Sequence, residues 1–201
     1  MKGLLLKDYY IIKSSIITLL ITFAVIGFGV SFFATPQVLI VIATTVLGMS
    51  VATIINIDKK CGWLKTAVTF PTPKRTIISS KYLMYVLLCL LGIVFGIIFS
   101  TMVSFVINDM NFSFLPLFTC LSIVMTFFSG GIMLPCFYLL DEEKSVVGAI
   151  IAYPLAAGFV FGMSKLIDNG TLSIAISILV SIIIFIISWC LVCKHVSTKD
   201  I

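Results

Sequence analysis

The sequence predicts an all-α integral membrane protein with six transmembrane helices. Hydrophobic residues make up 61% of the 201 residues, charged residues only 10%, and the mean hydropathy is +1.26. A water-soluble domain carries about 25% charged residues, so the composition excludes an ordinary soluble protein. The charged residues are also clustered along the chain, and between them lie uncharged stretches at 14–57, 82–108, 110–140, 145–164 and 169–193.

The uncharged stretches set the number of spans. About 20 apolar residues cross a bilayer as a helix, so four stretches hold one span each and the longest holds two, divided near Pro36. A cleavable signal peptide is the main alternative at the N-terminus, but the apolar run from Ser14 to Phe33 exceeds the roughly 7–15 residues of a signal core. We expect one transmembrane domain over 1–201, with spans at 14–34, 37–57, 82–107, 112–140, 145–164 and 170–193.

The basic residues predict the orientation of these spans. The segments 1–13, 58–81, 141–144 and 194–201 together contain twelve Lys and Arg residues, whereas the opposite segments contain only Lys165. Lys and Arg concentrate in cytoplasmic loops, so we expect a multi-pass plasma-membrane protein with both termini in the cytoplasm. The net charge of +5 follows from this topology, and nothing in the sequence indicates nucleic-acid binding.

Several functional classes lack the residues that they need. The predicted spans contain no Asp, Glu, Lys, Arg or His, which argues against a proton- or ion-coupled transporter. The chain has no Gly-x-x-x-x-Gly-Lys-Ser/Thr loop for nucleotide phosphates. Its single histidine, His195, directly follows the last span, and the six cysteines are interpreted as packing residues. We therefore expect no catalytic, cofactor or metal site in this chain.

The N-terminal segment 1–13 is the first candidate functional element. It either anchors the first span through its basic and aromatic residues or forms an interfacial elbow helix that enters the bilayer sideways. The residues assigned to this elbow helix are Leu5, Leu6, Lys7, Asp8 and Tyr9.

The long cytoplasmic segment 58–81 is the second candidate element. Its part 58–70 predicts a short helix, because Asp58 suits a helix N-terminus and the prolines at 71 and 73 would end the helix. Trp63, Ala67 and Phe70 recur on one face of that helix, with Leu64 beside them. Such a helix either floats at the lipid headgroups or fills a groove on a soluble partner.

This segment resembles a known family. The similarity is to permeases of type-2 ABC exporters, in the segment between their second and third spans. It rests on three runs of this sequence: Asp58-Lys59-Lys60-Cys61-Gly62-Trp63-Leu64-Lys65, Pro71-Thr72-Pro73-Lys74-Arg75 and Lys81-Tyr82. Lys7-Asp8 after a leucine run is similar to the start of the short bacterial members, including permeases that export amphipathic peptides. Two positions depart from the family: Lys65 stands where Glu is common, and Pro73 where Ser is common.

The resemblance implies a role for the loop. In that family the loop helix is a coupling helix that docks on a separate cytoplasmic ATPase, and two ATPases drive two permeases. ATP and Mg would then be bound by the partner ATPase, and this chain would pair with a second permease as a homo- or heterodimer. The implied ATPase-coupling residues are Asp58, Gly62, Trp63, Leu64, Ala67, Phe70, Pro71, Lys74 and Arg75.

Two further features have both a functional and an ordinary interpretation. The turn Asp141-Glu142-Glu143-Lys144 is either a second ATPase contact or a solvated charged turn. Two glycine pairs, Gly92 with Gly96 and Gly158 with Gly162, predict close helix packing, within the subunit before any dimer interface.

The predicted function is therefore a permease subunit that exports a hydrophobic or amphipathic substrate such as a peptide. The alternative is a membrane interaction, immunity or regulatory subunit that does not transport.

Overall fold

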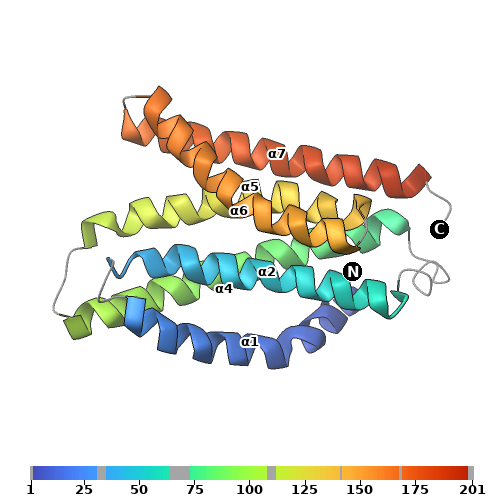
Figure 1. Cartoon of the computed structure of the whole chain (residues 1–201), viewed down its shortest axis with the longest axis horizontal. Helices are drawn as coiled ribbons and strands as arrows, with labels where there is room; N and C mark the ends of the chain where they lie inside the picture. The colour runs from blue at the N-terminus through green and yellow to red at the C-terminus, as the bar shows by residue number, and fades with distance from the viewer. Residues whose placement is uncertain are drawn as a thin grey trace.

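The computed structural model describes residues 2–30, 35–63, 73–107, 112–140, 142–167 and 169–198. Within these ranges every regular element is a helix, and no strand occurs. The helices run side by side along the long axis of the molecule (Figure 1). Their bounds are α1 Lys2–Val30, α2 Val38–Lys60, α4 Lys74–Ile107, the 3-10 helix η1 Phe112–Phe114, α5 Leu115–Leu139, α6 Glu142–Leu166 and α7 Gly170–Thr198. The predicted all-α fold is confirmed.

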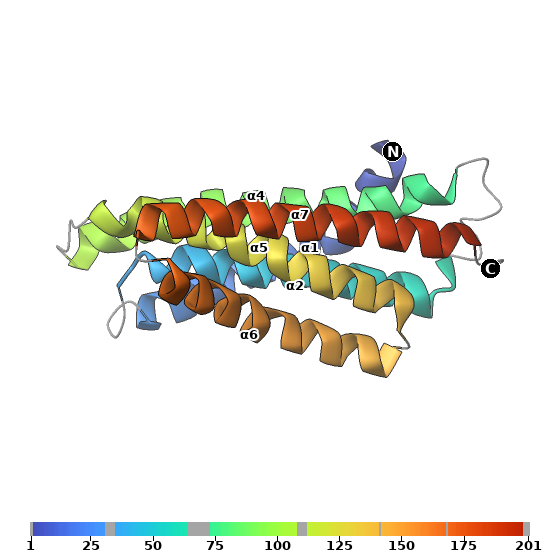
Figure 2. The ribbon, with the colours of Figure 1, turned by 90° about the horizontal axis from the view of Figure 1, so that it is seen from above.

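Five helices are long and apolar enough to cross a membrane: α2, α4, α5, α6 and α7. α1 supplies a sixth if its two parts count as one span. α1 bends by 48° between Gly3–Lys13 and Ile16–Val25. This bend coincides with the boundary expected between the N-terminal element and the first span. α1 begins and α7 ends at the same end of the bundle, which we call the terminal end (Figures 1 and 2).

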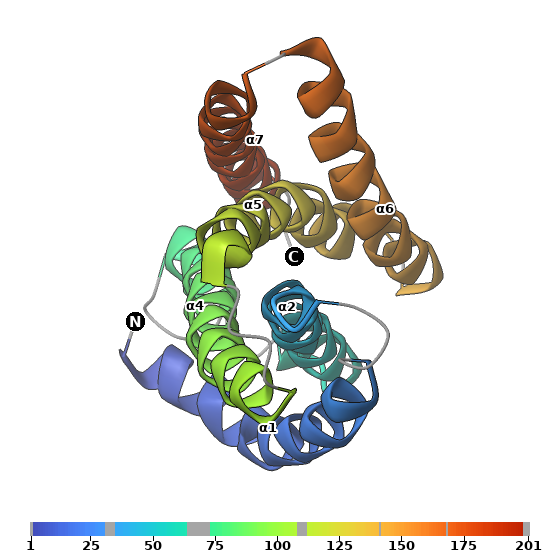
Figure 3. The same cartoon turned by 90° about the vertical axis from the view of Figure 1, so that its left-hand side faces the viewer.

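α2 lies at the centre of the bundle, surrounded by α1, α4, α5 and α6 (Figure 3). In its most apolar window 56% of the residues are buried, against 17% for α6. Two glycines of α4 allow α2 to approach closely. A Cβ atom added at Gly92 would lie 2.8 Å from Cα of Thr44, and one added at Gly96 would lie 2.7 Å from Cα of Ile40. This glycine pair therefore packs inside the subunit, as small residues do between membrane helices.

Buried hydroxyl groups join α4 to the second half of the chain. The hydroxyl of Tyr85 donates a hydrogen bond to the carbonyl oxygen of Thr126 on α5, at 2.9 Å. The hydroxyls of Tyr82 and Ser188 lie 2.9 Å apart and link α4 to α7. A bilayer core offers no water to polar groups, so these side chains meet their hydrogen-bonding needs within the protein.

α6 is the least enclosed span and packs mainly on α5. Its glycines Gly158 and Gly162 have no described atom within 4 Å of an added Cβ. The second glycine pair thus takes no part in the helix packing of the described chain, unlike the pair on α4.

The cytoplasmic segment is bounded differently from the sequence-based expectation. Asp58 does not begin a separate helix: α2 continues through Lys60 and ends at a turn over Cys61 and Gly62. α4 begins at Lys74, and its first turn includes a hydrogen bond from the N–H of Thr76 to the carbonyl of Pro73, at 2.8 Å. Proline is favoured at helix starts because its fixed φ suits a helix and its missing N–H is not needed there. The sequence analysis treated Pro73 only as a stop.

We expect the Gly96→Ala variant to be less stable than the wild type. The new methyl group would push α2 off α4, and overpacking of this kind costs about 1–3 kcal/mol. Thermal unfolding of the detergent-purified chain, followed by circular dichroism, measures the loss. Gly158→Ala is the control, because its methyl group meets open space. Equal melting temperatures for the two variants would contradict the close packing of α2 on α4.

Candidate functional site

Four charged side chains from three helices meet at the terminal end of the bundle. Lys7 and Asp8 come from α1, Asp58 from the last turn of α2, and Lys81 from the first part of α4. Asp8 is fully buried, Lys81 is 4% exposed and Asp58 6% exposed. We call these four residues the charge cluster. Lys7 is half-buried and closes the cluster on its outer side.

The distances within the charge cluster define a closed set of ion pairs. Lys81 Nζ lies 2.6 Å from Oδ1 of Asp8 and 2.5 Å from Oδ2 of Asp58. Lys7 Nζ lies 2.6 Å from Oδ1 of Asp58 and 3.5 Å from Oδ1 of Asp8. Each lysine therefore contacts both carboxylates, and the two positive charges balance the two negative ones.

Tertiary contacts, not local preference, explain why Asp58 is tolerated. The helix dipole disfavours a negative charge at a helix C-terminus, where α2 places Asp58. Burying an ion also carries a desolvation penalty of several kcal/mol, which only a well-placed counter-ion offsets. Lys7 and Lys81 supply two such counter-ions. Removing one partner would leave an uncompensated buried charge, so the charge cluster constrains α1, α2 and α4 to one arrangement.

The chain turns sharply next to the charge cluster. Two hydrogen bonds close the end of α2, from the N–H of Cys61 to the carbonyl of Ile57 at 2.9 Å and from the N–H of Gly62 to that of Lys59 at 3.1 Å. Gly62 has a φ of 65°, a conformation that costs glycine nothing and other residues energy. The turn brings the ring of Trp63 under the ammonium of Lys7, 4.2 Å from the ring centre.

The start of α4 is held against the end of α7. The guanidinium of Arg75 lies 4.8 Å from the ring centre of Trp189. The indole N–H of Trp189 donates to the hydroxyl of Ser79 at 3.1 Å, and that hydroxyl in turn donates to the carbonyl of Arg75 at 2.8 Å. Both flanks of the segment 61–73 are thus tied to the body of the bundle: α2 through Asp58 and α4 through Lys81 and Arg75.

The predicted site residues fall into three groups. Asp58, Gly62, Trp63, Lys74 and Arg75 all lie at the terminal end, as do the five elbow residues Leu5, Leu6, Lys7, Asp8 and Tyr9. Leu64, Ala67, Phe70 and Pro71 lie outside the described residues, as do Asp141 and the side chains of Glu142 and Glu143. Lys144 is exposed at the start of α6.

The α5–α6 turn lies next to the end of α2. The ammonium of Lys59 donates a hydrogen bond to the carbonyl of Leu140, at 3.3 Å. The end of α5 therefore lies beside the end of α2.

The sequence analysis missed the charge cluster itself. It assigned Lys7 and Asp8 to an elbow helix, Asp58 to a helix start, and Lys81 to the resemblance alone. A signal was present: these four charges border three predicted spans, and two are of each sign. No pattern in the sequence, however, specifies a pair 51 or 73 residues apart.

The described residues contain no group of three or more His, Cys, Asp or Glu side chains that could hold a metal ion. The charge cluster joins α1, α2 and α4 next to the described ends of the segment 61–73.

Comparisons with known proteins identify one match. A family model described as "ABC-2 family transporter protein" matches residues 3–199, nearly the whole chain. No curated protein and no solved structure gives a significant match.

We expect Lys81→Met to destabilise the protein strongly, because it leaves two buried carboxylates with one lysine. Breaking a buried ion pair costs about 3–5 kcal/mol. The measurement is the thermal unfolding and the yield of folded protein in detergent, with Lys13→Met as control, because Lys13 is exposed on the same end of the bundle. The double variant Asp8→Asn with Lys81→Met restores the charge balance and should recover part of the loss. A Lys81→Met variant as stable as Lys13→Met would contradict the stabilising role of the charge cluster.

Proposed function

The chain belongs to the ABC-2 family of transporter proteins, and on this basis we propose that it is the permease subunit of an ATP-driven exporter whose ATPase is a separate chain. The observation that carries the proposal is the charge cluster. It ties α1, α2 and α4 together at the point where the segment 61–73 leaves the bundle.

The proposed mechanism begins with a cytoplasmic ATPase docked on the segment 61–73. Movement of the docked ATPase pulls on the end of α2 and the start of α4. Asp58 and Lys81 transfer this movement to α1, because both are paired with α1 residues. The pairs are buried and short, so the three helix ends move as one body. The Lys7–Trp63 contact extends this body to the first residue beyond the turn.

ATP and Mg are proposed to bind in the partner ATPase, because the sequence contains no phosphate-binding loop of the Walker type. This arrangement places the terminal end of the bundle in the cytoplasm, as the distribution of Lys and Arg also favours. It gives a plasma-membrane protein with both termini on the ATPase side.

A second permease is proposed to pack on α6. This helix is buried over only 17% of its membrane window, and Gly158 and Gly162 present small residues with open space above them. Small residues at this spacing let two membrane helices approach closely. Either a second copy of the chain or a related permease can occupy this face.

The substrate is proposed to be hydrophobic or amphipathic, such as a peptide. An apolar chain rich in phenylalanine, with 17 Phe in all, suits this substrate class. The alternative function, a membrane interaction, immunity or regulatory subunit without transport, requires no ATPase and is distinguished by the first experiment below.

We expect Trp63→Ala to weaken ATPase association while the protein still inserts and folds. Truncating an aromatic anchor at an interface typically costs about 2 kcal/mol or more, which is about 30-fold in affinity. The chain is purified gently from its own host, and the ATPase recovered with it is quantified by mass spectrometry. Tyr10→Ala is the control, because it removes an exposed aromatic ring from the same end of the bundle.

Recovery of the wild-type chain without any ATPase, under conditions that preserve known complexes, would favour the non-transporting alternative. Recovery of equal ATPase with Trp63→Ala and Tyr10→Ala would remove Trp63 from the docking surface.

We expect Gly158→Leu to reduce pairing of permeases, because the larger side chain blocks close approach at α6. Pairing is measured by single-molecule photobleaching of the labelled chain in liposomes, alone and with any co-purified permease. Ala175→Leu on α7 is the control, because Ala175 is also an exposed small residue on a membrane helix. An unchanged dimer fraction in Gly158→Leu would place the interface on another helix.

A further inference from the structure

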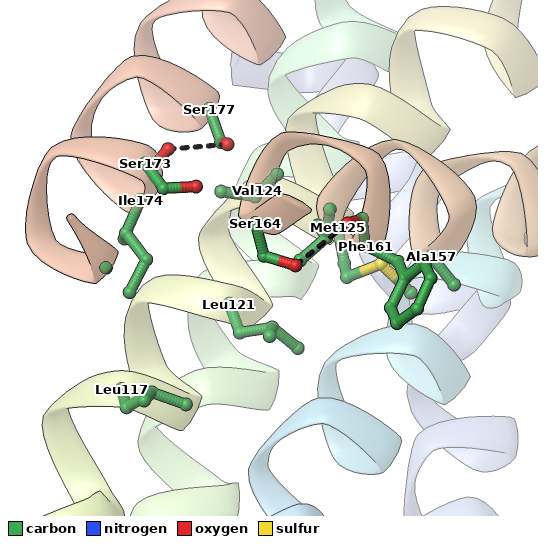
Figure 4. Close-up of a pocket in the computed structure, with 12 residues that line it drawn as sticks. Leu117, Leu121, Val124, Met125, Ala157, Phe161, Ser164, Ser173, Ile174 and Ser177 are labelled. Carbon is green, nitrogen blue, oxygen red and sulfur yellow. Dashed lines mark hydrogen bonds between the residues drawn. The ribbon is translucent and has the colours of Figure 1, made fainter. Parts of the chain in front are cut away.

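A hollow of about 420 Å³ opens between α5, α6 and α7 (Figure 4). It lies in the half of the bundle away from the charge cluster, because it is lined by the first turns of α5 and α7 and the last turns of α6. Its walls include Leu117, Leu121, Ala157, Phe161, Ser173 and Ile174.

The wall of this hollow is largely apolar, and two of its three serines bond their hydroxyls within their own helices. The hydroxyl of Ser164 donates to the carbonyl of Phe161 at 2.8 Å, and that of Ser177 donates to the carbonyl of Ser173 at 2.7 Å. Figure 4 shows both bonds running back along their own helices. The hollow therefore suits a hydrocarbon chain better than a polar molecule.

Lys165 lies beside the hollow. The ammonium of Lys165 lies 5.4 Å from the ring centre of Phe161, which lines the hollow. In the sequence-based topology Lys165 is also the only Lys or Arg in the segments opposite the basic side. Lys165 thus departs from the charge pattern of the chain, and it does so next to an apolar hollow large enough to hold a ligand.

We propose that this hollow binds one acyl chain of an anionic phospholipid, whose phosphate, unbalanced by any headgroup cation, pairs with Lys165. The helices that form it are candidate membrane spans, so lipid acyl chains would surround this part of the bundle. A methylene group takes roughly the 30 Å³ that a water molecule occupies in the liquid, so the hollow holds on the order of ten of them.

The charge at the rim selects the headgroup. A basic residue near a membrane surface attracts anionic lipid by about 1 kcal/mol, which corresponds to about a fivefold preference. The inference goes beyond the proposed function, because lipid binding at this place requires neither an ATPase nor transport.

The test uses the full chain in phosphatidylcholine nanodiscs that contain a minor fraction of phosphatidylglycerol with a photoreactive acyl chain. After illumination, mass spectrometry locates the labelled peptides. We expect labelling of 117–125 and 170–177 to exceed labelling of the exposed face of α4. The same probe with a phosphatidylcholine headgroup should label the hollow about fivefold less.

Two variants, each with a matched control, test the two parts of the site. Ala157→Trp fills the hollow and should abolish its labelling, whereas Ala175→Trp, an exposed alanine on α7 outside the hollow, should leave the labelling unchanged. Lys165→Gln should remove the headgroup preference, whereas Lys144→Gln, at the other end of α6, should keep it.

Three outcomes would overturn the proposal. Equal labelling of the hollow and of the α4 face would mean ordinary lipid contact. Equal labelling by the two headgroups in the wild type would remove the role of Lys165. If an added amphipathic peptide reduced the labelling of the hollow and added unlabelled phosphatidylglycerol did not, the hollow would be assigned to a peptide. None of these outcomes depends on ATPase binding, so failure here leaves the proposed function unaffected, and the reverse also holds.

Discussion

The structure depends first on the neutral burial of four charges where α1, α2 and α4 meet. A buried carboxylate or ammonium is tolerated only when a partner of opposite sign lies within bonding distance, and here each lysine meets both carboxylates. This requirement aligns three helix ends that hydrophobic packing alone would leave free to slide. It also explains why the terminal end of the bundle, though basic overall, contains two buried aspartates.

Packing deeper in the membrane makes the same three helices into a stable unit. Gly92 and Gly96 bring the backbone of α4 against α2, and Phe23 of α1 packs edge-on against Phe95 and Phe99 of α4. α5 joins this unit through the hydrogen bond from Tyr85. α6 is the least buried span, and its glycines Gly158 and Gly162 contact no other described helix. The molecule thus combines a tightly tied part near the coupling segment with an open face suited to other membrane components.

In a permease, the contrast between the joined helices α1, α2 and α4 and the open face of α6 has a mechanical consequence. A force applied to the segment 61–73 acts on helix ends that are fixed to one another, so little of it is lost in local bending. The open face of α6 and the hollow beside it lie away from the segment 61–73. Partner docking and lipid contact therefore use separate surfaces of one small chain.

The sequence by itself determined the class of protein and its all-helical, apolar character. These properties depend on hydropathy averaged along a continuous stretch, so they are local and appear in the sequence without knowledge of the fold. The resemblance also drew attention to Asp58, Gly62 and Trp63, which the structure places together at the terminal end of the bundle.

Only the tertiary structure decided which charges pair, which glycines are covered and where the helices end. Asp8 and Lys81 are 73 residues apart, and the two glycine pairs have the same spacing but opposite surroundings. Asp58 even has a local preference for a helix start, which its distant lysine partners override. Such outcomes depend on energies between segments far apart in the chain, and no local pattern records which segments will meet.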